Sequence, residues 1–255
     1  MSPRRLLAAT ALLLLAGCDG SAQAKPPQTP PPTVTAGRSA PPTRAPAPKP
    51  RITYPATGSR KFAVASGEAA APAGDRKGRL LRYHVLVERD IKGVTASEFA
   101  TAVTTTLRDP RSWTAGGQWR LQRVGPEQKA DFAVRLVTPA TRDRLCEGAT
   151  DGYTSCRTHD EVVINVARWA KGVPHYGASL AVYREYVINH EVGHRLGQAH
   201  ELCPGRGRPA PVMQQQTLGL HGCTPSAWPF LNGVRNRGRI GAYDDPVPPR
   251  DRGLS

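Results

Sequence analysis

The sequence is poor in methionine, cysteine and aromatic residues: its 255 residues include 2 Met, 5 Cys and 6% Phe, Trp and Tyr together. The cysteines include no Cys-x-x-Cys pair, which argues against a cysteine-rich zinc site. Acidic residues are also few, 20 against 35 basic ones, and the formal net charge is +15. This excess favours anionic partners such as cell-wall polymers or lipid headgroups. Because the arginines are scattered and accompany no nucleic-acid-binding motif, we expect no specific nucleic-acid binding.

The N-terminal apolar run, Leu6 to Ala16, is too short to cross a bilayer comfortably. It follows Arg4 and Arg5, as the core of a signal peptide does. The run ends in Leu-Ala-Gly-Cys at Cys18, which resembles a bacterial lipobox. Residues 1–18 are therefore predicted to be a lipoprotein signal peptide. We expect an exported protein, anchored by lipid at Cys18 to the outer face of the cytoplasmic membrane. The alternative is an ordinary signal peptide and a secreted protein.

Composition divides the remaining chain into three parts. Residues 19–60 are rich in Pro, Ala and Thr and have almost nothing to bury, so we expect a disordered, extended tether. Residues 61–245 are expected to form the folded domain. Residues 246–255 are polar and Pro-rich and are expected to be a flexible tail.

Export makes disulfide bonds possible. Besides Cys18 the chain has four cysteines, which allow three pairings. We favour local pairing, Cys146–Cys156 and Cys203–Cys223, in which each bond stabilises the fold by about 2–4 kcal/mol.

Hydrophobic patterning predicts an α+β domain built on one mixed sheet. Apolar and alternating runs predict strands at residues 80–87, 118–124, 130–137 and 161–167. Apolar residues at helical spacing predict a helix over residues 95–108, which Pro110 ends, and a second helix over residues 179–197.

The second helix carries the pattern H-E-x-x-H-x-x-G-x-x-H, which begins at His190. His190 and His194 lie one turn apart on the same helical face, about 6 Å from each other. Both can reach one zinc ion at about 2.1 Å. Gly197 can end the helix in a left-handed conformation, so that His200 can approach the same ion from another direction. Three protein ligands leave one tetrahedral position for water, which is the arrangement of a catalytic Zn²⁺.

Glu191 follows the first of these histidines. Its carboxylate can take a proton from water at the metal without being a ligand, so we expect Glu191 to be the general base. Tyr183 and Val187 precede His190 and His194 at spacings of four, three and four. The histidines therefore continue an inward, apolar stripe and should face the floor of a cleft.

The segment resembles the metzincin zinc peptidases, whose signature it matches at every fixed position. Met213, thirteen residues after His200, looks like the methionine that metzincins place in a tight turn beneath the zinc. Gln214 and Gln215 stand where certain families carry a tyrosine, so a tyrosine ligand is not expected. Glu201 follows the third histidine as in the astacin branch, although one residue assigns no branch. The resemblance covers roughly residues 160–225 and looks closest to a branch of exported actinobacterial proteins.

The resemblance implies a zincin/metzincin-like fold: a twisted mixed sheet with a backing helix and an active-site helix. It also implies an edge strand around residues 150–156 that pairs with extended substrate, a form of β-augmentation. The Cys146–Cys156 bond would stiffen this edge, and Cys203–Cys223 would tie the loop after His200 to the wall beyond Met213. Tyr176, Tyr183 and Tyr186 are candidates for stabilising a transition-state oxyanion.

The expected function is an extracytoplasmic zinc endopeptidase that acts on a peptide or protein. One alternative is a non-catalytic, zincin-fold binding lipoprotein. Some metzincins are held latent by a cysteine in a propeptide, but no propeptide is evident in this sequence, and its only N-terminal cysteine is Cys18. Glu191 argues against it, since a binding module has no use for that carboxylate. Another alternative is a zinc amidase acting on cell-wall peptides by the same chemistry.

His221 could line the cleft, or lie at the surface or in the core. His159 has no evident partner.

Overall fold

The computed structural model describes residues 50–147 and 150–255, which lie in a single unit, Ala47–Ser255. The predicted signal peptide, Cys18 and most of the predicted tether lie outside these residues. Within the part that is described, none of the helices is both long enough and apolar enough to cross a membrane.

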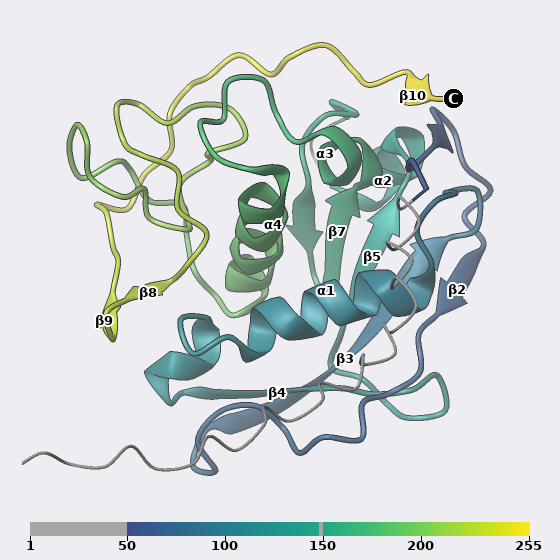
Figure 1. The fold of residues 1–255 in the computed structure, drawn as a ribbon, viewed down its shortest axis with the longest axis horizontal. Helices are drawn as coiled ribbons and strands as arrows, with labels where there is room; N and C mark the ends of the chain where they lie inside the picture. Colours follow the sequence, from purple (N-terminus) through teal and green to yellow (C-terminus); the bar gives the residue numbers. More distant parts are fainter. Residues whose placement is uncertain (1–49, 148–149) are drawn as a thin grey trace, which may run out of the picture. The chain divides into compact units, whose positions relative to one another are not determined.

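A mixed six-stranded sheet forms the centre of this unit (Figure 1). Three parallel strands lie in its middle: β3 (Arg79–Glu88), β5 (Phe132–Val137) and β7 (Glu161–Asn165). Antiparallel strands end it on both sides, β2 (Phe62–Val64) next to β3 and β6 (Cys156–Thr158) next to β7. β4 (Trp119–Arg123) runs parallel to the first half of β3. The predicted α+β class with one mixed sheet is therefore confirmed.

Other parts of the domain cover both faces of the central strands, and strands in this position are rich in apolar residues. In β7, Val162 and Ile164 are fully buried in the main core, together with residues of the helix that carries the histidines. Val163 between them belongs to a second cluster on the other face, with Val137 and Cys146.

Helices α1 (Ala96–Arg108) and α4 (Leu180–Arg195) pack on one face of the sheet (Figure 1). A capping box between Thr95 and Glu98 starts α1, and α1 ends before Pro110 as the pattern predicts. Its apolar stripe, Phe99, Val103 and Leu107, is fully buried. The two predicted helices are thus confirmed, with ends that differ by one or two residues.

Two short helices were not predicted, α2 (Pro139–Leu145) and α3 (Val166–Lys171). The strand expected over residues 161–167 ends at Asn165, because the Asn165 side chain accepts a hydrogen bond from the Ala167 N–H and starts α3. The other short elements are η1 (Trp113–Gly116) and two small pairs, β1 (Tyr54–Pro55) with β10 (Gly253–Leu254) and β8 (Phe230–Leu231) with β9 (Val234–Arg235).

The edge strand lies later than expected. Residues 150–155 are irregular, and β6 begins only at Cys156. The Asp151 carboxylate accepts hydrogen bonds from the Tyr153 and Thr154 N–H groups, which folds the chain into a turn. The prediction of a strand over residues 150–156 is therefore wrong in its position, although an edge strand does follow directly.

Both ends of the described chain pack on the domain, which differs from the expected boundaries of tether and tail. β1 lies within residues 19–60, and β10 lies within residues 246–255. The Asp251 carboxylate is buried and accepts hydrogen bonds from the Tyr54 hydroxyl (3.1 Å) and the Arg168 guanidinium (3.4 Å), and it pairs with Lys171. The polar, Pro-rich composition gave no sign of these partners, because they lie 80 or more residues away in sequence.

Asp251→Ala should lower the free energy of unfolding by about 3–5 kcal/mol, because it leaves the buried Arg168 without its carboxylate. Asp244→Ala, an exposed control in the same segment, should change it by less than about 0.5 kcal/mol. Urea titrations followed by circular dichroism measure both. Equal midpoints for the two variants would show that the C-terminal contacts contribute nothing.

Candidate metal centre and its cleft

A cleft of about 660 Å³ lies beside α4. One wall is the irregular segment and start of β6, from Asp151 to Arg157, and another is the segment from Gln215 to Leu218. All three histidines of the motif and Glu191 line it. The sequence pattern that placed the histidines in a cleft thus agrees with the structure.

The three motif histidines lie close together. Nε2 of His194 is 3.2 Å from Nε2 of His190 and 3.0 Å from Nε2 of His200. Across residues 50–147 and 150–255, this is the only group of three or more His, Cys, Asp or Glu side chains near enough to share a metal ion.

The end of α4 turns the third histidine towards the other two. Gly197 has φ +85°, the left-handed region. The Gly197 N–H donates to the His194 carbonyl at 3.0 Å, and the Gln198 N–H donates to the Gly193 carbonyl at 2.9 Å. These two bonds form a Schellman motif, which ends the helix and reverses the chain before His200.

Backbone carbonyls fix two of the rings. Nδ1 of His190 lies 2.8 Å from the Val212 carbonyl, and Nδ1 of His194 lies 2.8 Å from the Gln198 carbonyl. Since a carbonyl oxygen only accepts, each Nδ1 carries the proton and each Nε2 presents a lone pair.

The three imidazoles are neutral at neutral pH. Burial, with the neighbouring rings, lowers the pKa of His190 well below its usual value and that of His200 to about 4. Burial also lowers the pKa of His194. Lone pairs on Nε2 of His190 and His194 therefore face each other at 3.2 Å. Such an arrangement is repulsive unless a cation lies between them.

Met213 lies directly beneath the histidine helix. The Gln214 N–H donates to the Pro211 carbonyl at 3.0 Å, so Met213 occupies a tight turn, and its side chain is fully buried. A Cβ added to Gly193 would lie 2.5 Å from Sδ of Met213 and 2.6 Å from a Trp113 ring carbon. Glycine at position 193 therefore leaves room for Met213 and Trp113 to pack against the helix, a role that the sequence pattern did not reveal.

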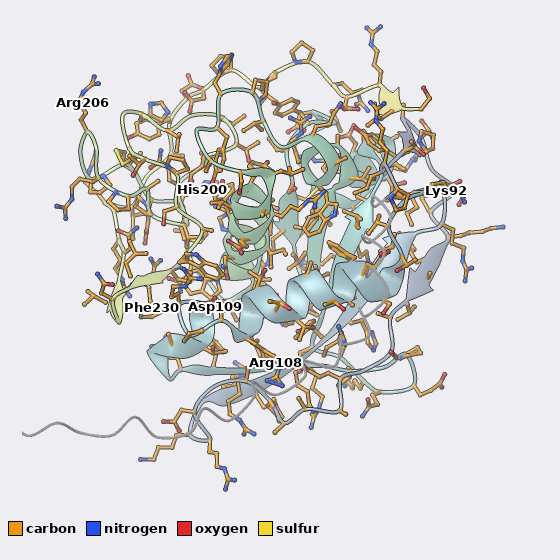
Figure 2. All side chains as sticks on the ribbon, in the orientation of Figure 1. Lys92, Arg108, Asp109, His200, Arg206 and Phe230 are labelled. Carbon is orange, nitrogen blue, oxygen red and sulfur yellow. A yellow bond between two sulfur atoms is a disulfide. The ribbon has the colours of Figure 1, made fainter. Side chains whose placement is uncertain are left out.

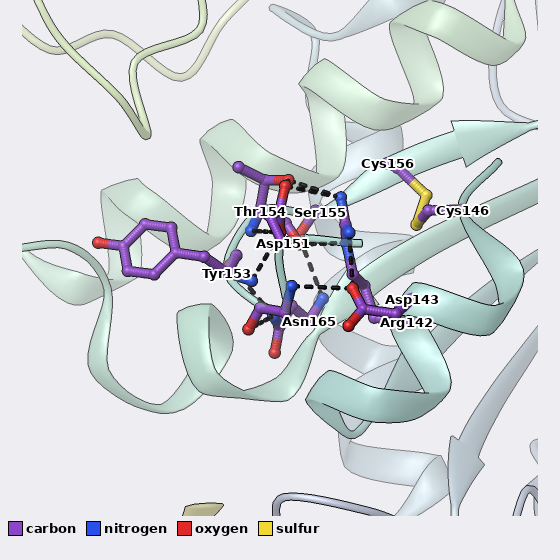
Figure 3. The surroundings of a disulfide bond; sticks show 10 residues. Arg142, Asp143, Cys146, Asp151, Tyr153, Thr154, Ser155, Cys156 and Asn165 are labelled. Carbon is purple, nitrogen blue, oxygen red and sulfur yellow. Dashed lines mark hydrogen bonds and ion pairs between the residues drawn. A yellow bond between two sulfur atoms is a disulfide. The ribbon is translucent and has the colours of Figure 1, made fainter. Parts of the chain in front are cut away.

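Glu191 lines the cleft and is 5% exposed. Burial raises the pKa of its carboxyl to about 8, against the opposing charge of Arg142. The Arg142 side chain is buried and binds Asp151 and the Thr154 hydroxyl, as Figure 3 shows. These bonds hold the turn that forms the cleft wall, and the sequence gave no signal for them.

Both disulfides that local pairing predicts are present, with Cα–Cα distances of 6.0 and 5.9 Å. Cys146–Cys156 joins the end of α2 to the start of β6, beside the Arg142 network (Figure 3). Cys203–Cys223 joins the loops that follow His200 and Met213. Both bonds therefore brace segments next to the cleft.

The three tyrosines considered as oxyanion donors are engaged elsewhere. The Tyr186 hydroxyl donates to the Gln214 carbonyl, the Tyr176 hydroxyl donates to the Gln216 side chain, and the Tyr183 hydroxyl bonds the Thr217 hydroxyl. All three hold the segment after Met213. The structure therefore gives them a positioning role, which corrects the expectation.

The remaining candidates lie outside the histidine cluster. His159 is exposed beside Glu147, and His221 pairs with Asp245 at 2.8 Å and stacks on Tyr243. Glu201 is buried, pairs with Arg235 at 3.2 Å and accepts from the Gly238 N–H. Its contacts secure the loop after His200.

Residues 49–227 match the family model described as "Protein of unknown function (DUF3152)", and since the match covers more than half of the chain, the chain belongs to this family. The matched region contains the histidine cluster, Met213 and both disulfides. Neither a curated protein nor a solved structure matches the chain.

Gly193→Ala tests the packing beneath the cluster. Helix propensity alone predicts that the change stabilises the protein by about 1 kcal/mol. The crowding against Met213 and Trp113 predicts a loss of about 1–3 kcal/mol instead. Thermal and urea unfolding decide between the two signs, and a gain in stability would contradict the account of Met213.

Proposed function

We propose that the protein is an exported, zinc-dependent hydrolase that cleaves peptide bonds in the cleft beside α4. The observation that carries this proposal is the convergence of three neutral imidazoles. Nε2 of His194 lies 3.2 Å from Nε2 of His190 and 3.0 Å from Nε2 of His200. Two ligands of one tetrahedral zinc, with bonds of about 2.1 Å, are separated by roughly 3.4 Å. The cluster therefore fits the ion closely.

The surroundings of the cluster also suit zinc. Metal-binding histidines commonly donate the other ring N–H to a carbonyl or carboxylate, which fixes the tautomer and the orientation of the ring. The Val212 and Gln198 carbonyls do this for His190 and His194. The cluster opens to the cleft, which leaves room for water and substrate.

Glu191 supplies the acid–base chemistry in this proposal. Zinc bound by the histidines would lower the pKa of a water molecule and polarise a substrate carbonyl. The Glu191 carboxylate accepts a proton as the water oxygen bonds to the carbonyl carbon. It then gives that proton to the leaving nitrogen as the carbon–nitrogen bond breaks. The pKa of Glu191 is raised because its carboxyl is buried. A zinc ion bound by the neighbouring histidines would lower this pKa again.

The choice of a peptide bond rests on the resemblance to the metzincins. Three features support a metzincin-like arrangement: the third histidine after a Schellman turn, Met213 in a tight turn beneath the helix, and the antiparallel edge strand β6 at the cleft. Among residues 50–147 and 150–255, β6 is hydrogen-bonded to a strand on one side only, so an extended peptide can add to its other edge.

Two disulfides support an oxidising compartment outside the cytoplasm. With the lipobox at Cys18, we propose a lipoprotein on the outer face of the cytoplasmic membrane, whose Pro-rich tether gives the domain reach. A secreted protein is the alternative. The excess of basic residues favours anionic wall polymers as neighbours.

Glu191→Gln separates catalysis from metal binding. The variant should retain about one zinc per chain and lose hydrolysis of a peptide library by a factor of about 10² or more, because it removes the general base. Glu185→Gln, on the same helix and outside the cleft lining, is the matched control and should cleave like the wild type. Mass spectrometry of the digests and metal analysis give the two readouts.

Wild type that binds zinc but cleaves neither the peptide library nor isolated wall peptides would favour the non-catalytic binding protein. Cleavage of wall peptides alone would favour the amidase. Wild type without zinc would overturn the proposal as a whole.

Zinc should also stabilise the fold, because the ion binds the folded cluster more tightly than the unfolded chain. At free zinc 100-fold above the dissociation constant, the gain is about 2.7 kcal/mol. Chelation should lower the melting temperature of the wild type, and zinc should restore it. His200→Ala should show no response to either. A response of equal size in this variant would place the stabilising ion elsewhere.

A further inference from the structure

Arg157 is the central residue of β6, and the strand register fixes the face on which it lies. Arg157 pairs with Val162, and Cys156 pairs with Val163. Val163 and Cys156 pack in the cluster on the α2 side of the sheet, whereas Val162 packs in the core with residues of α4. Because residues directly opposite each other share a face, Arg157 lies on the α4 side, the side of the histidines.

The side chain of Arg157 is exposed and lines the cleft together with His194. Arg157 and the three histidines therefore line the same cleft, in which the reacting bond would lie.

No carboxylate in the described part of the chain pairs with Arg157. Asp151, on the same wall, is held by Arg142 and Thr154. Asp160, three residues later, pairs with Arg195 at 3.0 Å. Arg157 is thus an exposed cation that lines the cleft without a paired carboxylate, and it lies on the strand edge where an extended peptide would add.

We propose that Arg157 is a specificity-determining residue that binds a carboxylate of the substrate next to the cleaved bond. The carboxylate comes either from an acidic side chain or from the free C-terminus of a peptide. This inference rests on the proposed hydrolase function of the cleft, and it narrows the substrate to anionic peptides.

The size of the effect follows from the exposure of the arginine. A solvent-exposed ion pair contributes up to about 1 kcal/mol, which corresponds to roughly a fivefold preference. Salt should weaken this preference, since the Debye length falls from about 10 Å at 0.1 M to about 3 Å at 1 M.

The test compares kcat/KM for matched peptides with Glu, Gln or Lys on either side of the cleaved bond, each as a C-terminal acid and as an amide. Wild type should prefer Glu over Gln about fivefold if the side chain is bound, or acid over amide if the C-terminus is bound. Arg157→Gln should abolish the preference, and Arg157→Glu should reverse it in favour of Lys. Arg206→Glu is the matched control, because Arg206 lies on an outer loop away from His200 (Figure 2).

A binding measurement separates this inference from the proposed function. Zinc-loaded Glu191→Gln protein should bind a labelled acidic peptide more tightly than its neutral counterpart, and the added Arg157→Glu change should remove the difference. Fluorescence anisotropy measures this without any cleavage. If the wild type cleaves peptides but Arg157→Glu keeps its preference, with unchanged zinc content, the inference is wrong and the hydrolase stands. If no peptide is cleaved while Arg157 still governs acidic binding, the proposed function is wrong and the anionic site stands.

Discussion

The geometry of the histidine cluster depends on two backbone carbonyls, which fix the orientation of two imidazole rings. The Val212 and Gln198 carbonyls take the Nδ1 protons of His190 and His194, so that both Nε2 lone pairs face the same point. His200 completes the group because the chain reverses at Gly197. A cation bound between the two Nε2 atoms, which lie 3.2 Å apart, would relieve the repulsion between their lone pairs, and this is the basis of the proposed metal site.

Contacts from several parts of the domain hold the histidine cluster in position. Met213 fills the space under the helix that glycine at position 193 leaves open, and the turn around Met213 also presents the Val212 carbonyl. The buried tyrosines of α4 hold the segment after that turn. The two disulfides brace the loops on either side of the cleft. The cluster is therefore positioned by contacts that reach well beyond the motif.

The sequence predicted the parts that depend on periodicity and fixed spacing. The helix of the motif, the position of Gly197 and the convergence of the histidines follow from local geometry alone. Contacts between distant segments could not be predicted in this way: Asp251 with Arg168, and Arg142 with Asp151, involve polar residues that look solvated in sequence. The edge strand begins later than the family resemblance implied, because the Asp151 carboxylate holds a turn that a resemblance at the motif does not reveal.

The central claim is that one zinc ion occupies the histidine cluster with three imidazole ligands. Zinc K-edge X-ray absorption spectroscopy of the purified protein tests it most directly. The account predicts a first shell with about three nitrogen ligands near 2.0–2.1 Å and a light fourth ligand, without sulfur. A shell containing sulfur, or the same spectrum from a variant in which alanine replaces His190, His194 and His200, would contradict it.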